Sequence, residues 1–246
     1  MEPIKRKLDF LSGFIAITGP PNVGKSTLLN RILGTKLAIV SPKSQTTRNR
    51  IIGIYHGDGF QMVFMDTPGI HKTRTALHRS MVESALAAFH EVDILLLMIE
   101  MTHPNSIEVS SIIHKIKVTG KPCLLVINKI DLGSKEHLLP IIDNYSRIYP
   151  FDAIIPVSAL KGHGLDTLLA QLKSSLRPGP QFFPTDMKTD QSEAFMVAEI
   201  IREKIYASLK KELPYSSAVT VDKMEEIPKK DLLSISARIH VEADSQ

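Results

Sequence analysis

The stretch ITGPPNVGKSTLLNRILG, residues 17–34, has residue types and a spacing suited to binding a polyphosphate. It fits the pattern G-x-x-x-x-G-K-[ST], with an apolar run before it and a helical pattern after it. Glycines let backbone N–H groups approach phosphate oxygens, and a helix N-terminus adds its dipole. Lys25 is predicted to reach the β- and γ-phosphates, and the Ser26 hydroxyl to hold Mg²⁺. The predicted phosphate-binding residues are Gly19, Pro20, Pro21, Asn22, Val23, Gly24, Lys25, Ser26 and Thr27.

Two further stretches offer groups for the metal and the γ-phosphate. Asp66-Thr67-Pro68-Gly69 ends an apolar run, which places a carboxylate near Mg²⁺ and a glycine N–H near the γ-phosphate. Gln45-Thr46-Thr47-Arg48 offers a hydroxyl that can join Mg²⁺ when the γ-phosphate is present. The predicted metal ligands are Ser26, Thr47 and Asp66, and the predicted catalytic residues are Lys25 and Thr47.

The motif Asn128-Lys129-Ile130-Asp131 selects the base. A carboxylate can accept hydrogen bonds from the N1–H and the exocyclic amino group of guanine, a pattern that adenine does not offer. The motif therefore indicates GTP and GDP rather than adenine nucleotides. Ser158-Ala159-Leu160 is predicted to set a backbone N–H against the guanine O6. Each of the stretches other than the phosphate loop could by itself be an ordinary loop, and the order of all five along the chain favours a nucleotide site.

The elements that position these motifs are alternating strands and helices. Strands are expected at Phe14–Thr18, Ile51–His56, Gln61–Asp66, Asp93–Ile99, Cys123–Asn128 and Ala153–Pro156. Helices are expected near residues 25–34, 75–89, 105–117, 135–148 and 164–176. This alternation predicts an α/β fold, the doubly wound sheet of P-loop NTPases. The hairpin signal Gly57-Asp58-Gly59-Phe60 makes one edge strand antiparallel, so the sheet is expected to be mixed.

The pattern changes at RPGPQFFPTD, residues 177–186, where three prolines and a glycine interrupt both periodicities. We interpret residues 1–176 as one domain, residues 177–190 as a linker and residues 191–246 as a smaller α+β unit. In that unit a helix is expected from residue 192 onward, followed by strands in SSAVTVDKM and DLLSISARIHVE.

Composition narrows the setting without deciding the function. The chain has 246 residues, 43% of them hydrophobic, and a single cysteine, which excludes a disulfide framework and fits a reducing cytoplasm. The longest apolar run, Ile94 to Ile99, is too short to span a bilayer. The net charge of +4 permits nucleic acid or an anionic membrane surface as a partner. We expect a cytoplasmic monomer, with peripheral membrane contact left open.

The motifs GPPNVGKST, QTTR, DTPG, NKID and VSAL resemble those of the translation-factor-related GTPases of the Era/TrmE-like class. The tail FFPTDMKTDQSEAFMVAEIIREKIYASLKKELPYSSAV is similar to the linker and first helix of the Era family of bacterial ribosome-assembly GTPases. The resemblance covers the chain from Gly13 onward. It implies a GTPase domain and a C-terminal KH domain that binds the 3′ end of small-subunit ribosomal RNA, the 16S rRNA of the 30S subunit. The implied function is a checkpoint in small-subunit maturation.

Two features depart from the pattern of that family. A KH domain clamps RNA with a G-x-x-G loop, and this chain has no glycine after Gly179, so the KH-like unit is expected to be incomplete and RNA binding weakened. Ile70 follows DTPG at a position that also belongs to the predicted nucleotide site, where many GTPases have a water-orienting glutamine. Similar proteins with an apolar residue there hydrolyse GTP slowly. Asn22 either helps to hold K⁺, as in similar proteins, or only shapes the loop.

The resulting interpretation is a GTP-hydrolysing molecular switch. Water is expected to attack the γ-phosphate in line, with Lys25 and Mg²⁺ neutralising the developing charge. The loops around Thr47 and Gly69 are expected to become ordered only when that phosphate is present. The alternative is a nucleotide-gated scaffold for RNA or protein with negligible hydrolysis, which Ile70 keeps open.

Overall fold

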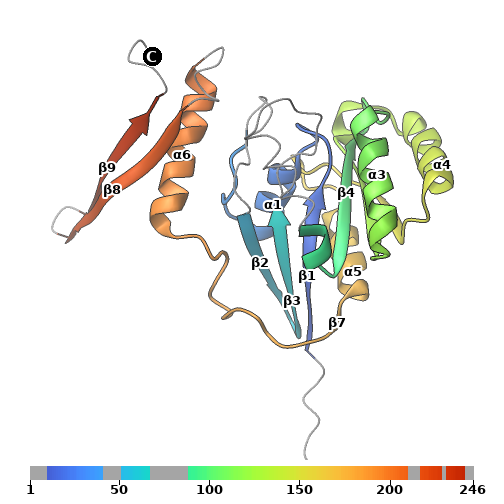
Figure 1. The fold of residues 1–246 in the computed structure, drawn as a ribbon, viewed down its shortest axis with the longest axis horizontal. Helices are drawn as coiled ribbons and strands as arrows, with labels where there is room; N and C mark the ends of the chain where they lie inside the picture. The colour runs from blue at the N-terminus through green and yellow to red at the C-terminus, as the bar shows by residue number, and fades with distance from the viewer. Residues whose placement is uncertain (1–9, 41–50, 67–87, 210–216, 229–230, 242–246) are drawn as a thin grey trace, which may run out of the picture.

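The computed structural model of the chain describes residues 10–40, 51–66, 88–209, 217–228 and 231–241. Its main feature is a seven-stranded sheet in which six strands follow the order β2-β3-β1-β4-β5-β6 (Figure 1). The strands are β1 Leu11–Thr18, β2 Ile51–Gly57, β3 Phe60–Asp66, β4 Ile94–Glu100, β5 Cys123–Asn128, β6 Ala153–Pro156 and the short β7 Arg177–Pro178. β7 pairs antiparallel with the start of β1.

The strand directions agree with the prediction of a mixed sheet. β1 pairs in parallel with β3 and β4, and β5 pairs in parallel with β4 and β6. β2 lies at the edge and runs antiparallel to β3. Gly59, in the turn between β2 and β3, has a φ of 74°, a conformation that glycine adopts without steric cost. The doubly wound α/β fold and its antiparallel edge strand are confirmed.

Helices cover both faces of the sheet. They are α1 Lys25–Leu33, α3 Ile107–Thr119, α4 Leu138–Ile148 and α5 Leu165–Ser175. Side chains of α1 and α5 pack on one face, and side chains of α3 and α4 pack on the other. Because both faces are covered, a central strand such as β4 is a continuous apolar run, ILLLMIE with only its last residue charged. Within the described ranges, no helix combines the length and apolar character needed to cross a bilayer.

A few boundaries differ from the expected ones. β1 begins at Leu11 rather than Phe14, because Leu11 to Gly13 continue the pairing with β3. The helix expected over 135–148 begins as a 3₁₀ turn, η2 Lys135–His137, and becomes α-helical only at Leu138. The helix expected over 75–89 falls almost wholly outside the described residues.

The segment that follows β7 is held against the sheet by hydrogen bonds. We call residues 182–189 the strap. Its start is held by Gln61, a fully buried side chain whose Nε2 donates to the Phe183 carbonyl at 2.8 Å and whose Oε1 accepts from the Phe182 N–H at 2.9 Å. Its end lies antiparallel to β2, where the Ile54 N–H donates to the Lys188 carbonyl at 2.8 Å. The predicted linker thus begins with the short strand β7 and continues as a segment that is packed on the sheet.

The C-terminal part contains a helix and two strands, as the sequence predicts. These are α6 Glu193–Ser208, β8 Ala218–Ile227 and β9 Leu232–His240, and Figure 1 shows them at one side of the sheet. The Ser192 side chain caps α6 by accepting from the Phe195 N–H at 3.2 Å. α6 contacts the first unit through Glu203, whose carboxylate accepts from Lys36 Nζ at 2.7 Å. Several apolar side chains of β9 are exposed, namely Leu232, Leu233, Ile235 and Ile239.

Candidate nucleotide-binding site

The loop between β1 and α1 has a backbone that only glycine can form at two positions. Gly19 has a φ of 151°, and a Cβ there would lie 2.3 Å from the Met98 carbonyl oxygen. Gly24 has a φ of 98°, and a Cβ there would lie 2.3 Å from Asn128 Nδ2. Asn22 is also left-handed, with a φ of 63°, which asparagine tolerates better than most residues. The loop therefore keeps its backbone bare, as binding of a polyphosphate by N–H groups requires.

Lys25, the first residue of α1, folds back over this loop. Its Nζ donates to the carbonyls of Gly19 at 3.1 Å and Pro20 at 2.8 Å. Burial lowers the pKa of Lys25 to about 8, although the nearby charge of Asp66 acts in the opposite direction. A buried ammonium that donates to neutral carbonyls can exchange them for an anion.

The predicted metal ligands of α1 and β3 meet beside this lysine. Ser26 Oγ donates to Asp66 Oδ2 at 2.8 Å, and Asp66 is fully buried at the end of β3. A hydroxyl and a carboxylate are hard oxygen ligands of the kind that Mg²⁺ prefers, so this pair fits the metal. The remaining predicted groups of this region lie outside the described residues: Thr47, Thr67, Pro68, Gly69 and Ile70.

Asn128, at the end of β5, joins the phosphate loop to the predicted base-binding loops. Its Nδ2 donates to the Val23 carbonyl at 2.7 Å, and its Oδ1 accepts from the Ala159 N–H at 2.9 Å. All three residues are buried, with exposed fractions of 3% or less. Asn128 and Val23 are 105 positions apart in the sequence. One side chain therefore fixes the relative position of segments that are distant along the chain.

Asp131 and Ser158 form the other side of the same region. Ser158 Oγ donates to Asp131 Oδ1 at 2.5 Å and accepts from the Lys161 N–H at 3.1 Å. Asp131 belongs to the 3₁₀ turn η1 Ile130–Leu132 and is exposed, so its carboxylate can be reached by a base. The Ile130 N–H donates to the Val157 carbonyl at 3.3 Å, which holds the turn against the strand end. The structure thus brings NKID and VSAL together.

Two charged residues that the sequence reasoning missed also belong to this region. Glu100, at the end of β4, forms an ion pair with Lys129. Arg31 of α1 donates to the Ala159 carbonyl at 3.2 Å and to the Leu160 carbonyl. The position of Glu100 after an apolar strand was a usable signal, because ligands of such sheets bind at the carboxyl ends of the strands. Arg31 carries no comparable signal in the sequence.

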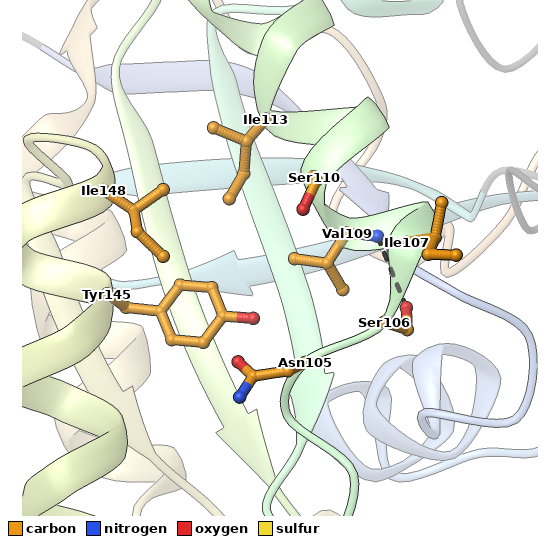
Figure 2. A pocket seen from close by; sticks show the side chains of 8 residues that line it. All are labelled: Asn105, Ser106, Ile107, Val109, Ser110, Ile113, Tyr145 and Ile148. Atoms are coloured by element: carbon orange, nitrogen blue, oxygen red, sulfur yellow. Dashed lines mark hydrogen bonds between the residues drawn. The ribbon is translucent and has the colours of Figure 1, made fainter.

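A separate cavity of about 210 Å³ lies between α3 and α4 (Figure 2). Its lining is Asn105, Ser106, Ile107, Val109, Ser110, Ile113, Tyr145 and Ile148. None of these residues is charged or belongs to the predicted nucleotide site. Figure 2 shows Ser106 bonded to the Val109 N–H, which caps α3, and the Tyr145 hydroxyl donates to the Pro104 carbonyl. The Ser106 and Tyr145 hydroxyls thus serve the local structure.

Comparison with known proteins places this arrangement in a family. The family described as "50S ribosome-binding GTPase" matches residues 14–129. The GTPase Era of Syntrophus aciditrophicus is 54% identical over 240 residues, which cover 96% of this chain and 78% of the relative. The chain belongs to the GTPase Era family. The Era of Geotalea uraniireducens is 49% identical over 237 residues, covering 96% of this chain and 80% of that relative.

Solved structures of Era have the same fold. Era in complex with MgGDPNP and nucleotides 1506–1542 of 16S ribosomal RNA superposes with a TM-score of 0.90 at 40% identity, over 96% of this chain and 80% of that one. A variant of Aquifex aeolicus Era bound to GDP·AlF4⁻ gives a TM-score of 0.89 at 39% identity, with the same coverage. The resemblance inferred from the motifs and the tail is confirmed, as are the P-loop GTPase fold and the GTPase class.

Proposed function

We propose that this Era-family GTPase is a GTP-driven switch in small-subunit maturation and that its predicted site residues have the roles assigned from the sequence. The observation that carries this proposal is the Asn128 side chain. It ties the phosphate loop, through Val23, to the loop of Ala159. A phosphate cradle and a guanine-selective carboxylate are thereby held in one rigid site.

The contacts of Lys25 support its proposed role in hydrolysis. When GTP binds, Lys25 Nζ exchanges the Gly19 and Pro20 carbonyls for the β- and γ-phosphates, where its charge stabilises the transferring group. Ser26 and Asp66, which are hydrogen-bonded to each other here, would hold Mg²⁺. The bound ion would supply positive charge that stabilises the phosphate oxygens. We propose that Thr47 completes the metal site. The residues proposed to contact the γ-phosphate are Thr67, Pro68, Gly69 and Ile70.

The base end of the site is proposed to be selective for guanine. Asp131 accepts from the N1–H and amino group of the base, in exchange for its contact with Ser158. The Ala159 N–H, which donates to Asn128 Oδ1 in this structure, is proposed to exchange that acceptor for the guanine O6. Lys129 and Ile130 flank the base.

Steady-state phosphate release separates an active switch from a scaffold without hydrolysis. The chain is expected to release phosphate slowly from GTP with Mg²⁺, and Lys25→Ala is expected to abolish that release, because loss of one contact to a transferring group costs about 3 kcal/mol or more. Lys117→Ala, at an exposed lysine of α3, is the control and should be unchanged. Equal turnover of Lys25→Ala and the wild type would contradict the proposal. Faster release in K⁺ than in Na⁺ would favour a cation role for Asn22 over a purely conformational one.

The proposed partner is the 3′ end of small-subunit ribosomal RNA on the 30S subunit. An Era of 40% identity was crystallised with such an RNA segment, and this supports the proposal. We also propose a cytoplasmic monomer, with peripheral contact at the inner face of the cell membrane as a secondary proposal that vesicle cosedimentation tests.

A further inference from the structure

The carboxylate of Glu100 is held on both of its oxygens. Oε2 accepts from Lys129 Nζ, and Oε1 lies 2.9 Å from His103 Nδ1. The Glu100 side chain is 19% exposed and the Lys129 side chain 30% exposed, so the pair is partly shielded from water. Two partners on one carboxylate restrict its rotamer, and a restricted carboxylate restricts the lysine that it binds.

The backbone makes Glu100 a fixed neighbour of the NKID motif. β4 and β5 pair in parallel with Glu100 opposite Asn128, and the Met101 N–H donates to the Asn128 carbonyl at 2.9 Å. The ends of two central strands are therefore joined at the point where Lys129 begins to leave the sheet. Glu100 reaches Lys129 from a rigid element rather than from a loop.

Lys129 needs such support because of its own backbone. Its φ of 64° is in the left-handed region, which a lysine adopts only when its surroundings hold it there. It lies between Asn128, which fixes the phosphate loop, and Asp131, the proposed guanine acceptor. Any movement of Lys129 is therefore passed to both of these residues.

The charge of Glu100 persists across neutral pH. Burial raises the pKa of its carboxyl, but the hydrogen bond and charge of Lys129, with a smaller contribution from His103, outweigh burial and the pKa is lowered. The partner of Lys129 is thus an anion under all ordinary conditions.

We propose that Glu100 is a positioning residue for the guanine nucleotide: it anchors Lys129 at the base end of the site and thereby slows the dissociation of bound nucleotide. The residue that it anchors, Lys129, belongs to the base end of the site, so GDP and GTP are affected alike and the chemical step is not. The inference rests on the proposed place of Lys129 in the base pocket.

The test compares nucleotide dissociation rates of the full chain with fluorescent GDP and a fluorescent non-hydrolysable GTP analogue. Glu100→Gln keeps the shape but removes the charge, and it should speed the dissociation of both nucleotides by the same factor, about three- to tenfold for loss of one charge-assisted contact on a partly exposed group. Glu100→Asp keeps the charge and should restore part of the residence time.

A matched control and a double variant exclude a general structural effect. Asp143→Asn removes an exposed ion pair with Arg147 on α4 and should leave the dissociation rate unchanged. Adding Glu100→Gln to Lys129→Met should cause no further acceleration, because Glu100 acts through Lys129. Additive effects, an unchanged rate for Glu100→Gln, or acceleration confined to the GTP analogue would each overturn the inference. An unchanged rate for Lys129→Met alone would instead refute the proposed role of Lys129.

Discussion

Truncation of Asn128 to alanine is the perturbation that tests the site most directly. The change removes the donor to the Val23 carbonyl and the acceptor of the Ala159 N–H. Both groups are buried, so water cannot readily replace the lost partner. We expect the nucleotide-free protein to become less stable, and the phosphate loop and base loop to lose their fixed spacing.

The magnitude follows from the two groups left without a partner. A buried donor or acceptor that loses its partner costs about 1–3 kcal/mol, so the two together should lower the free energy of unfolding by about 2–6 kcal/mol. For a chain of this length, each kcal/mol corresponds to about 2–4 °C in Tm. Asn128→Asp should cost at least as much, because it keeps the acceptor for Ala159 but sets a carboxylate oxygen against the Val23 carbonyl.

Urea unfolding of the nucleotide-free protein, followed by circular dichroism, measures this loss. Asn144→Ala is the matched control, because Asn144 is an exposed residue of α4 where alanine is the better helix former. Similar stabilities of Asn128→Ala and Asn144→Ala, within about 0.5 kcal/mol, would refute the reasoning. A stable Asn128→Asp variant would show that the donor to Val23 is unimportant.

Three further predictions concern the base, the buried lysine and RNA. Asp131→Asn should weaken GTP and favour xanthosine triphosphate, because the amide presents a donor to the xanthine carbonyl; competition between the two nucleotides measures the change. The pKa of Lys25 is lowered from 10.5 to about 8, so between these pH values the unfolded chain binds more protons and the nucleotide-free wild type should gain stability as pH rises, relative to Lys25→Met. A constant difference between the two in urea unfolding from pH 8 to 10.5 would contradict this. Binding of the chain to the 3′ end of small-subunit ribosomal RNA should weaken as the salt concentration rises, because cationic side chains that contact phosphates release counterions. Filter binding at two salt concentrations tests this, and an affinity that does not change with salt would contradict it.

The nucleotide motifs were predictable because their chemistry is local. The glycines of the phosphate loop are required by the backbone itself, as the φ values of Gly19 and Gly24 show. The apolar runs that become central strands are equally local, since burial on both faces demands a continuous run. The Gly57-Asp58-Gly59-Phe60 turn predicted the antiparallel edge for the same reason.

The contacts that were not predictable join residues far apart in the sequence. The Glu100–Lys129 pair spans 29 positions, the Arg31–Ala159 contact 128 and the Gln61–Phe183 contact 122. Each of these contacts depends on which strands become neighbours in the sheet. The sequence around a single glutamate, arginine or glutamine does not indicate which distant residue it will contact. The packing of the strap on the sheet could not be predicted either, because prolines interrupt the alternation of side chains by which a strand is recognised.

The strap also determines where the protein can be divided. A GTPase unit cut after α5 would leave the buried Oε1 of Gln61 without the Phe182 and Phe183 N–H donors and would remove the Phe183 carbonyl that Nε2 binds. It would also uncover the edge of β2 that the strap now covers. An uncovered edge strand pairs readily with another molecule, so such a fragment should aggregate. A unit that extends to residue 190 keeps these bonds. The smallest portion of the chain that can be isolated intact is therefore longer than its last GTPase helix indicates, and the covalent bridge to α6 is part of the first unit's own fold.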